Sequence, residues 1–370
     1  MNNTIAVRKC AGYDPVEVEA LIREIYSVTK GPDVKGKKVL VKPNILSDHD
    51  PSRCISTHPV VVEAMVKFLQ SEGAAVVIGD SPAIHTGKFK PTKSGIEDVC
   101  KRTGAGWINF TEDPIEKTLK KGKIKVASIV DRVDLIISMP KFKNHELVYF
   151  TGAVKNTLGL VPAFNKTKQH ALHHDREGFS ELLVQLNEAV TPDYFLMDGI
   201  TGMEGPGPAR GVPVKLGVLF GSTNPLALDL TASRIAGYNP LVIPTSRIAL
   251  HRKKWLKSEN DIVYDGPELG SLIRHDFKRI PLSGFSNISV KFLMNRVGFI
   301  RKFDRRPVFI RQNCTGCHKC IRICPVEAIK PSAAAHNYIM LTDRKCIRCY
   351  CCSEVCGDDA VEIRRKLLGV

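Results

Sequence analysis

Short apolar runs alternate with amphipathic stretches through the first two thirds of the chain. The run Lys38–Lys42 ends at a Pro-Asn pair, and the stretch after it keeps apolar residues at helical spacing from Val62 to Leu69. Thr57 is the expected N-cap of that helix, with Pro59 in its first turn. Further strands are predicted at 74–78, 134–138, 194–197 and 216–220, and a helix at 225–236. Strands separated by helices predict an α/β domain built on a doubly wound, largely parallel sheet.

Polar residues follow these predicted strands at their carboxyl ends. In doubly wound sheets, ligands bind at these ends, near the point where the strand order reverses. The polar rim predicted here consists of Lys42, Asn44, Asp80, Ser81, the segment Lys141–His145 and the segment Asp198–Glu204. No G-x-G-x-x-G sequence follows a predicted strand, so a Rossmann-type nicotinamide site is not expected.

Eight cysteines near the C-terminus fall into two nearly identical frames that lie 32 residues apart. The first frame reads C-x2-C-x2-C-x3-C-P and the second reads C-x2-C-x2-C-x3-C-G. This pattern is the signature of a bacterial two-cluster ferredoxin, in which the fourth cysteine of each frame ligates the cluster of the other frame. We therefore predict two [4Fe–4S] clusters. The first is held by Cys314, Cys317, Cys320 and Cys356, and the second by Cys346, Cys349, Cys352 and Cys324.

Two other interpretations of the cysteines fit less well. Zinc ribbons pair two C-x2-C knuckles, rather than three cysteines in register with a fourth. Disulfides need an oxidising compartment, and the N-terminus does not resemble a signal peptide, so we expect a cytoplasmic protein. Gly357 replaces the second proline of the signature, and Cys351 is expected to be a bystander between two ligands.

The cysteine-rich module occupies only the end of the 370-residue chain. We expect an α/β domain over residues 1–306, with a basic connecting segment at 241–306, and a small α+β ferredoxin-like domain over 307–370. No apolar run is long enough to span a bilayer. The formal net charge of +16 includes local basic runs that could attract an acidic electron donor or an anionic substrate. Few aromatic residues interleave with these runs, so nucleic-acid binding is not expected.

Two further patterns allow more than one interpretation. Residues 291–303 mix apolar and basic positions, which is typical of a linker packed between domains or of a basic amphipathic helix at a membrane surface. His170, His173 and His174 precede Asp175 and could bind a metal, but a solvated, mobile segment fits them as well.

Five short motifs resemble those of the DUF362 family, whose name stands for a domain of unknown function. They are Val41–Asn44, Gly79–Ser81, Pro140–His145, Gly152–Asn156 and Met203–Pro208, and the resemblance covers about residues 35–240. Members of this family often carry a two-cluster ferredoxin tail, as this chain does. The resemblance implies the architecture and favours an iron–sulfur oxidoreductase role.

A second similarity is to the lactate-racemase fold, which carries a Pro-His pair, a Gly-rich loop ending in Lys, and a later His. His145, Lys155 and His170 follow in that order here. In that family the Lys anchors a nickel pincer nucleotide and the later His ligates nickel. Asn144 and Ala153-Val154 depart from the racemase pattern, so the similarity indicates a shared fold rather than a nickel site.

The sequence favours a reductase whose clusters pass single electrons to a small, anionic, unsaturated substrate on the rim. The catalytic candidates are His145, Lys155 and Glu204, because an imidazole, an ammonium or a carboxyl group can carry a proton. Neighbouring lysines are expected to lower the pKa of His145. The substrate-binding candidates are Lys42, Asn44, Asp80, Ser81, Lys141, Lys143 and Asn156.

The expected electron donor is a low-potential carrier such as ferredoxin or flavodoxin. No flavin motif is evident, although a flavin bound without a recognisable motif stays open. Two alternatives to the reductase are a non-catalytic electron-transfer protein that docks redox partners, and a ligand- or cofactor-binding protein distantly related in fold to lactate racemase.

Overall fold

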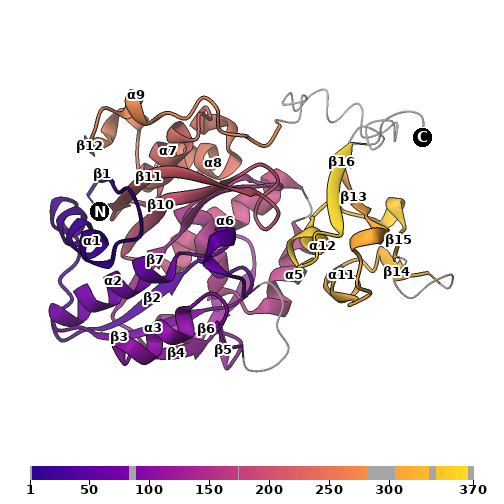
Figure 1. The fold of residues 1–370 in the computed structure, drawn as a ribbon, viewed down its shortest axis with the longest axis horizontal. Coiled ribbons are helices and arrows are strands. Elements are labelled where there is room, and N and C mark those ends of the chain that lie inside the picture. The colour runs from indigo at the N-terminus through magenta and orange to yellow at the C-terminus, as the bar shows by residue number, and fades with distance from the viewer. Residues whose placement is uncertain (1, 83–88, 174, 282–304, 333–338, 366–370) are drawn as a thin grey trace.

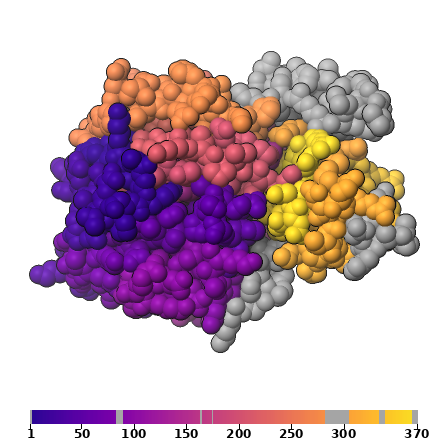
Figure 2. All heavy atoms as spheres, viewed as in Figure 1, coloured from indigo at the N-terminus to yellow at the C-terminus, as the bar shows by residue number. Residues whose placement is uncertain are grey.

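Apolar strands and amphipathic helices alternate along the chain as the sequence predicts. The computed structural model describes residues 2–82, 89–173, 175–281, 305–332 and 339–365. They form a larger α/β domain and a small C-terminal module at one end of it (Figure 1). In the space-filling view the module packs directly against the larger domain (Figure 2).

Ten of the described strands pair into one mixed sheet. Its main order is β12-β1-β11-β10-β7-β2-β3-β4, and β8 and β9 branch from β10. Neighbours are parallel from β10 through β7, β2 and β3 to β4, whereas β11 is antiparallel to β1 and β10. The strands are β1 Thr4–Lys9, β2 Lys38–Pro43, β3 Ala75–Asp80, β4 Gly106–Asn109, β7 Leu135–Met139, β8 Lys141–His145, β9 Tyr149–Thr151, β10 Tyr194–Glu204, β11 Val212–Ser222 and β12 Val263–Asp265. The predicted doubly wound, largely parallel α/β fold is therefore confirmed, with an antiparallel extension on the β11 side.

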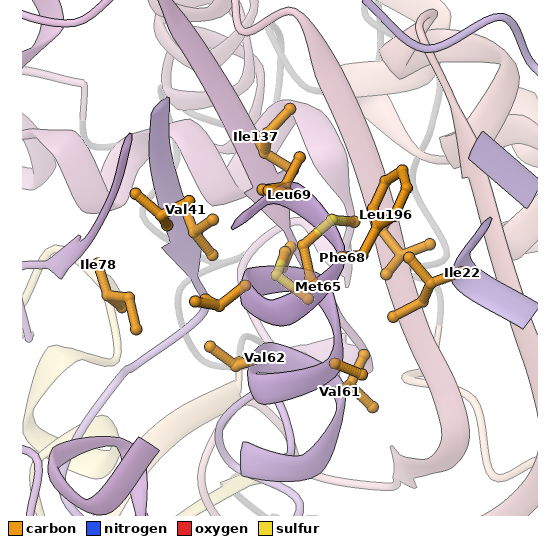
Figure 3. Close-up of a cluster of buried hydrophobic side chains, with 14 of the residues drawn as sticks. Ile22, Val41, Val61, Val62, Met65, Phe68, Leu69, Ile78, Ile137 and Leu196 are labelled. Atoms are coloured by element: carbon orange, nitrogen blue, oxygen red, sulfur yellow. The ribbon is translucent and has the colours of Figure 1, made fainter. Parts of the chain in front are cut away.

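Both faces of the sheet are covered because its central strands are apolar on both sides. Val39 and Val41 belong to one core, whereas Leu40 between them belongs to the other. The first core packs against α1, α2 and α3, as Figure 3 shows for Met65 and Leu69 of α2 beside the sheet. Burying one such aliphatic side chain stabilises the fold by about 1.5–3 kcal/mol.

The helices on the two faces have the following bounds. On the first face lie α1 Pro15–Val28, α2 Pro59–Ser71 and α3 Ile96–Thr103. On the other lie α4 Ala153–Asn156, α6 Arg176–Val190, α7 Pro225–Ile235 and α8 Pro244–Arg252. The helix α5 Ala163–Leu172 lies at the end of the domain near the C-terminal module (Figure 1). A hairpin of β5 Pro114–Thr118 and β6 Lys123–Ala127 and the short α9 Leu269–Leu272 complete the larger domain.

The predicted N-cap of α2 is wrong by one residue. His58 is the N-cap, and its Nδ1 accepts a hydrogen bond from the backbone N–H of Val60 at 3.3 Å. Pro59 opens the helix as expected. The Thr57 hydroxyl instead accepts from Asn44 N at 2.9 Å and donates to the carbonyl of Met139 at 2.6 Å. Thr57 therefore joins the ends of β2 and β7 rather than capping the helix.

The C-terminal module repeats one arrangement twice. β13 Arg305–Phe309 pairs with β16 Val361–Arg365, and β14 Ile329–Pro331 pairs with β15 Ile339–Leu341, both antiparallel. α11 Lys319–Ile323 and α12 Cys351–Glu354 each contain the third cysteine of one frame. The amphipathic pattern at 291–303 lies outside the described residues, as does His174.

Candidate functional site

The first set of predicted cluster ligands surrounds one cavity in the C-terminal module. Cys314, Cys317, Cys320 and Cys356 all line it. The first three come from one frame, and Cys356 comes from the other. Cys317 is exposed to solvent, so this cavity opens at the surface of the module.

The second set is also drawn together, and it adjoins the first. The Cys352 thiol is buried and interacts electrostatically with Cys349, Cys346 and Cys324. It also interacts with Cys320 of the first set. The two groups of thiols are therefore neighbours, with Cys356 among the cysteines of the first frame and Cys324 near Cys352 of the second.

The chemistry of both sets fits iron–sulfur ligation. Cys324 Sγ accepts a hydrogen bond from Ala328 N at 3.2 Å, and Cys356 Sγ accepts the equivalent bond from Ala360 N at 3.2 Å. Burial, together with nearby thiols, raises the pKa of Cys320 to about 11. Crowded thiols of this kind resist ionisation on their own, and the iron of a cluster would offset the charge of their thiolates.

The helix α12 brings the second set up to the larger domain. Glu354, at the end of α12, places its Oε1 3.2 Å from Nε2 of the buried His145 on β8. The distance is short, although the angles are not those of a regular hydrogen bond. His145 Nδ1 accepts the backbone N–H of Leu147 at 3.1 Å, so a neutral ring carries its proton on Nε2, toward the carboxylate.

The charge states of this pair follow from their surroundings. Burial, with the nearby Lys155, lowers the pKa of His145 to about 3, so the ring is neutral at physiological pH. Burial alone would raise the pKa of Glu354, but the contacts with His145 and Lys155 lower it to about 2. Glu354 is therefore an ionised carboxylate at the boundary of the two domains.

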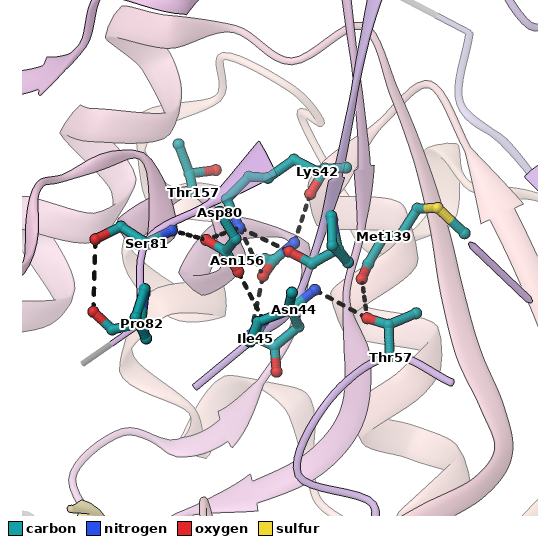
Figure 4. Close-up of polar contacts among 12 residues, drawn as sticks. Lys42, Asn44, Ile45, Thr57, Asp80, Ser81, Pro82, Met139, Asn156 and Thr157 are labelled. Carbon is teal, nitrogen blue, oxygen red and sulfur yellow. Dashed lines mark hydrogen bonds and ion pairs between the residues drawn. The ribbon is translucent and has the colours of Figure 1, made fainter. Parts of the chain in front are cut away.

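Four of the predicted substrate-binding residues form one network at the carboxyl ends of β2 and β3 (Figure 4). Lys42 Nζ lies 3.1 Å from Asp80 Oδ1 and donates to Pro43 O at 2.9 Å. Asn156 Oδ1 accepts from Lys42 at 3.3 Å and from Asn44 Nδ2 at 3.0 Å. These contacts organise the rim and leave the charge of Lys42 balanced by Asp80, whereas Asn44 Oδ1 has no hydrogen-bond partner among the described residues.

Three other lysines beside this network have no ion pair with a carboxylate among the described residues. Lys143 donates to Ile55 O at 2.6 Å, and Lys166 donates to the carbonyls of Ser81 and Pro82. Lys155 is partly exposed, and the described part of the chain gives its ammonium neither a hydrogen bond nor an ion pair. Burial lowers the pKa of all three, and that of Lys166 falls to about 7.

A buried carboxylate fixes the position of Lys155. Asp229 on α7 accepts the backbone N–H groups of Ala153 at 2.6 Å and Val154 at 3.1 Å, which begin α4. Gly152 precedes them, and a Cβ at that position would overlap the Asp229 carboxylate. The G-A-V-K-N motif therefore needs its glycine because the cap approaches so closely.

Two predicted site residues lie in other networks. Lys141 pairs with Asp198 at 2.6 Å, and both also contact the hydroxyl of Tyr13. Glu204 accepts Lys278 N at 2.9 Å. The structure thus places His145, Lys143 and Lys155 near Glu354 of the module and links Lys155 to the network of Lys42 and Asp80, whereas the ion pair of Lys141 and the backbone contact of Glu204 are made elsewhere.

Two residues of this region, Lys166 and Glu354, were missing from the sequence-based candidates, and His170 was considered only as a possible metal ligand. Lys166 and His170 are four residues apart on α5, a spacing that puts them on one helix face and could have been noticed. His170 is 5% exposed and stacks on Phe179, so the expected solvated histidine segment is wrong at this position. Glu354 had no sequence signal, because only the packing of α12 on β8 brings it to the site.

An α/β domain joined to a module with two ferredoxin-type cysteine sets defines an iron–sulfur protein of the electron-transfer class. Residues 39–234, more than half of the 370-residue chain, match the family described as "Domain of unknown function (DUF362)". Residues 306–357 match the 4Fe-4S dicluster domain. The chain belongs to the DUF362 family and carries a C-terminal iron–sulfur domain.

Known proteins give further similarities. The thylakoid-associated protein sll1697 of Synechocystis sp. is 29% identical over 272 residues, which cover 70% of this chain and 85% of that protein. The lactate racemase apoprotein of Thermoanaerobacterium thermosaccharolyticum is 16% identical, with a TM-score of 0.39, over 57% of this chain and 54% of that one. A Thermotoga maritima structure is 15% identical, with a TM-score of 0.32, over 54% and 52%. The chain spans about half the length of these two solved structures.

In the part of the chain that the structure describes, every helix is too short or too polar to cross a membrane.

Proposed function

We propose that this protein is an iron–sulfur oxidoreductase that reduces a small, anionic, unsaturated substrate at the boundary between its two domains. The observation that carries the proposal is the position of α12. This helix contains Cys352 of the second cysteine set, and it also sets Glu354 against His145 and brings Cys351 near Lys155. When bound, the clusters supply single electrons, and the substrate takes up two electrons and two protons.

The side chains of the site divide the remaining tasks. Lys155 has a cation free to bind the anionic group of the substrate. Lys166, with a pKa of about 7, can hold and release a proton at neutral pH, whereas the neutral His145 is a poor acid because its pKa is about 3. We therefore assign delivery of one proton to Lys166, with the second taken from solvent, and the orientation of Glu354 to His145. Glu204 has no part in this arrangement.

Electrons enter, in this proposal, at the exposed side of the module. Cys317 is exposed, whereas Cys346 and Cys352 are buried, so the first cysteine set is the more accessible to a partner. A low-potential carrier such as ferredoxin or flavodoxin fits that role. A cytoplasmic location is part of the same proposal.

Reoxidation of the reduced holoprotein tests the proposal. Anaerobically reconstituted protein should contain about eight irons per chain. After reduction with dithionite, at least one compound from a panel of unsaturated carboxylates and phosphate esters should reoxidise it, and Lys155→Met should slow that reaction while keeping its iron. Reoxidation by redox proteins alone would favour the non-catalytic electron carrier, with Cys317 marking its docking side.

A further inference from the structure

Lys143, Lys155 and Lys166 have no carboxylate partner among the described residues, so their positive charges are left for a ligand to compensate. A buried ammonium loses its hydration and is costly unless an opposite charge compensates it. Carbonyl oxygens provide part of that compensation for Lys143 and Lys166. Lys155 is partly exposed, and within the described residues it receives none from a hydrogen bond or an ion pair.

The local carboxylates do not balance these charges. Asp80 and Glu354 are the carboxylates among the strongest electrostatic influences on the three lysines. Asp80 is already paired with Lys42. Glu354 then faces Lys143, Lys155 and Lys166 together, which leaves an excess of two positive charges when all three are protonated.

A buried polar atom without a partner lies beside the same lysines. His170 is 5% exposed, its Nδ1 makes no hydrogen bond among the described residues, and its pKa is influenced by Glu354 and Lys155. Buried polar atoms are nearly always satisfied in folded proteins, by a ligand or water if not by the protein. This atom therefore calls for a hydrogen-bond partner, from a ligand or water, close to Glu354 and Lys155.

We propose that the group formed by Lys143, Lys155, Lys166 and His170 binds a dianionic oxyanion, the chemistry shared by a phosphate group and a dicarboxylate. The proposal rests on the location of the proposed function and specifies the class of its substrate. A dianion matches the excess charge, whereas a neutral ligand would leave the ammonium of Lys155 uncompensated.

Measuring anion binding to the reconstituted holoprotein tests the proposed dianion site without requiring turnover. Inorganic phosphate and succinate are titrated separately by calorimetry at constant ionic strength, and the reduction potentials of the clusters are measured with and without each anion. We expect saturable binding of at least one of the two anions and a more negative potential for one cluster, because a nearby anion disfavours adding an electron. Tighter binding of phosphate than of succinate would assign the group to phosphorylated ligands, and the reverse to dicarboxylates.

Substitutions of Lys155 and Lys168 test where the anion binds. Lys155→Met should weaken the affinity about tenfold or more, since it removes a charge-assisted contact, and Lys155→Arg should retain part of it. Lys168→Met is the matched control, because Lys168 is exposed on the same helix as Lys166 and should leave binding unchanged. Absence of saturable binding, or equal binding by Lys155→Met, would overturn the proposal.

A competing explanation is that the negative charge of the second cluster, rather than a bound dianion, compensates the positive charge of the lysines. In that case Lys155→Met would make the cluster potential more negative, but neither anion would bind or shift it, and the proposal would fail. Saturable binding without any substrate-driven reoxidation would instead retain the dianion site and remove the reductase. Reoxidation by a monoanionic or neutral substrate, with no binding of phosphate or succinate, would instead retain the reductase and remove the dianion site.

Discussion

The buried lysines differ in how their charge is stabilised, and this difference sets their chemistry. Lys42 has Asp80 at 3.1 Å and two further oxygen partners, so it acts as part of the framework. Lys141 is similarly committed to Asp198. Among the described residues Lys166 has carbonyl oxygens as its only hydrogen-bond partners, and burial lowers its pKa to about 7. A lysine that titrates near neutrality can exchange a proton with a ligand, which a paired lysine cannot do.

This titration predicts a pH dependence for anion binding. The pKa of Lys166 is lowered in the folded protein, so the free site is charged mainly below about pH 7 and loses that charge as the pH rises through 7. Succinate affinity should therefore fall between about pH 6.5 and 8.5, a range in which succinate itself stays doubly ionised. Calorimetry across this range should show a clearly weaker dependence for Lys166→Met. An equal dependence of succinate affinity on pH in both proteins would contradict the assignment of this titration to Lys166.

Asp229 gives a second prediction, about stability. Burial raises its folded pKa from the ordinary 3.8 to about 7 although two backbone N–H groups stabilise the carboxylate. The folded protein therefore binds more protons than the unfolded chain between about pH 4 and 7, and this group's contribution to stability declines as the pH rises through that window. Denaturation of wild-type protein and of Asp229→Asn at several pH values should show this decline only in the wild type. A matching slope in Asp229→Asn would assign the decline to other groups.

At the scale of elements, the short helix α4 is positioned by its environment rather than by its own propensity. Its four residues are too few for a stable isolated helix, so the cap from α7 and the glycine before it determine where Lys155 lies. Asn156 at the end of α4 in turn bonds Lys42 and Asn44 at the end of β2 and Ser138 on β7. The position of Lys155 is thus determined by contacts between residues that are distant in sequence.

Gly152→Ala tests this dependence. The added methyl group would overlap the Asp229 carboxylate, so α4 or the cap has to move, at a cost of about 1–3 kcal/mol. We expect lower stability in urea denaturation, and a loss of anion binding by the folded variant. Gly106→Ala is the control, since a Cβ on that β4 residue meets no atom within 4 Å. Equal stability and binding in both variants would show that the cap is not needed to place Lys155.

The elements that the sequence predicts well are those whose apolar pattern is strong. The strands β2, β3 and β7 and the helix α7 lie within two residues of their predicted bounds, because strands buried on both faces read as continuous apolar runs. β10 is longer than predicted, since it continues through the segment Asp198–Glu204 that was expected to follow it. The N-cap of α2 was misplaced because Thr57 found long-range partners in Asn44 and Met139, which local sequence cannot reveal. α12 was not predicted to contact β8 for the same reason.

At the scale of the whole molecule, the site exists only because the module is held against the larger domain. Arg305 pairs with Glu146, and the hydroxyl of Tyr350 donates to the carbonyl of Arg305 at 3.0 Å. Arg210, in the loop after β10, donates to Val361 O at 2.6 Å and lies 3.3 Å from Asp359. The sequence motifs predict the α/β domain and the C-terminal module separately. Their relative placement depends on these contacts between residues that are far apart in the chain. That is why His145 and Lys155 were recognisable from sequence and Glu354 was not.

Arg210 provides the test of this arrangement. Its guanidinium is largely buried at the boundary and bonds a backbone carbonyl of β16, so Arg210→Ala should weaken the docking of the module by about 1.5–3 kcal/mol. The cysteine sets lie within the module, so the variant should retain its iron while β8, α4 and α12 become less protected in hydrogen exchange. Arg364→Ala is the control, because Arg364 is exposed and pairs only with Glu362 of its own strand among the described residues. If Arg210→Ala kept full protection and anion binding, the boundary would be held by other contacts. If it lost iron as well, the module would depend on the larger domain for its own folding.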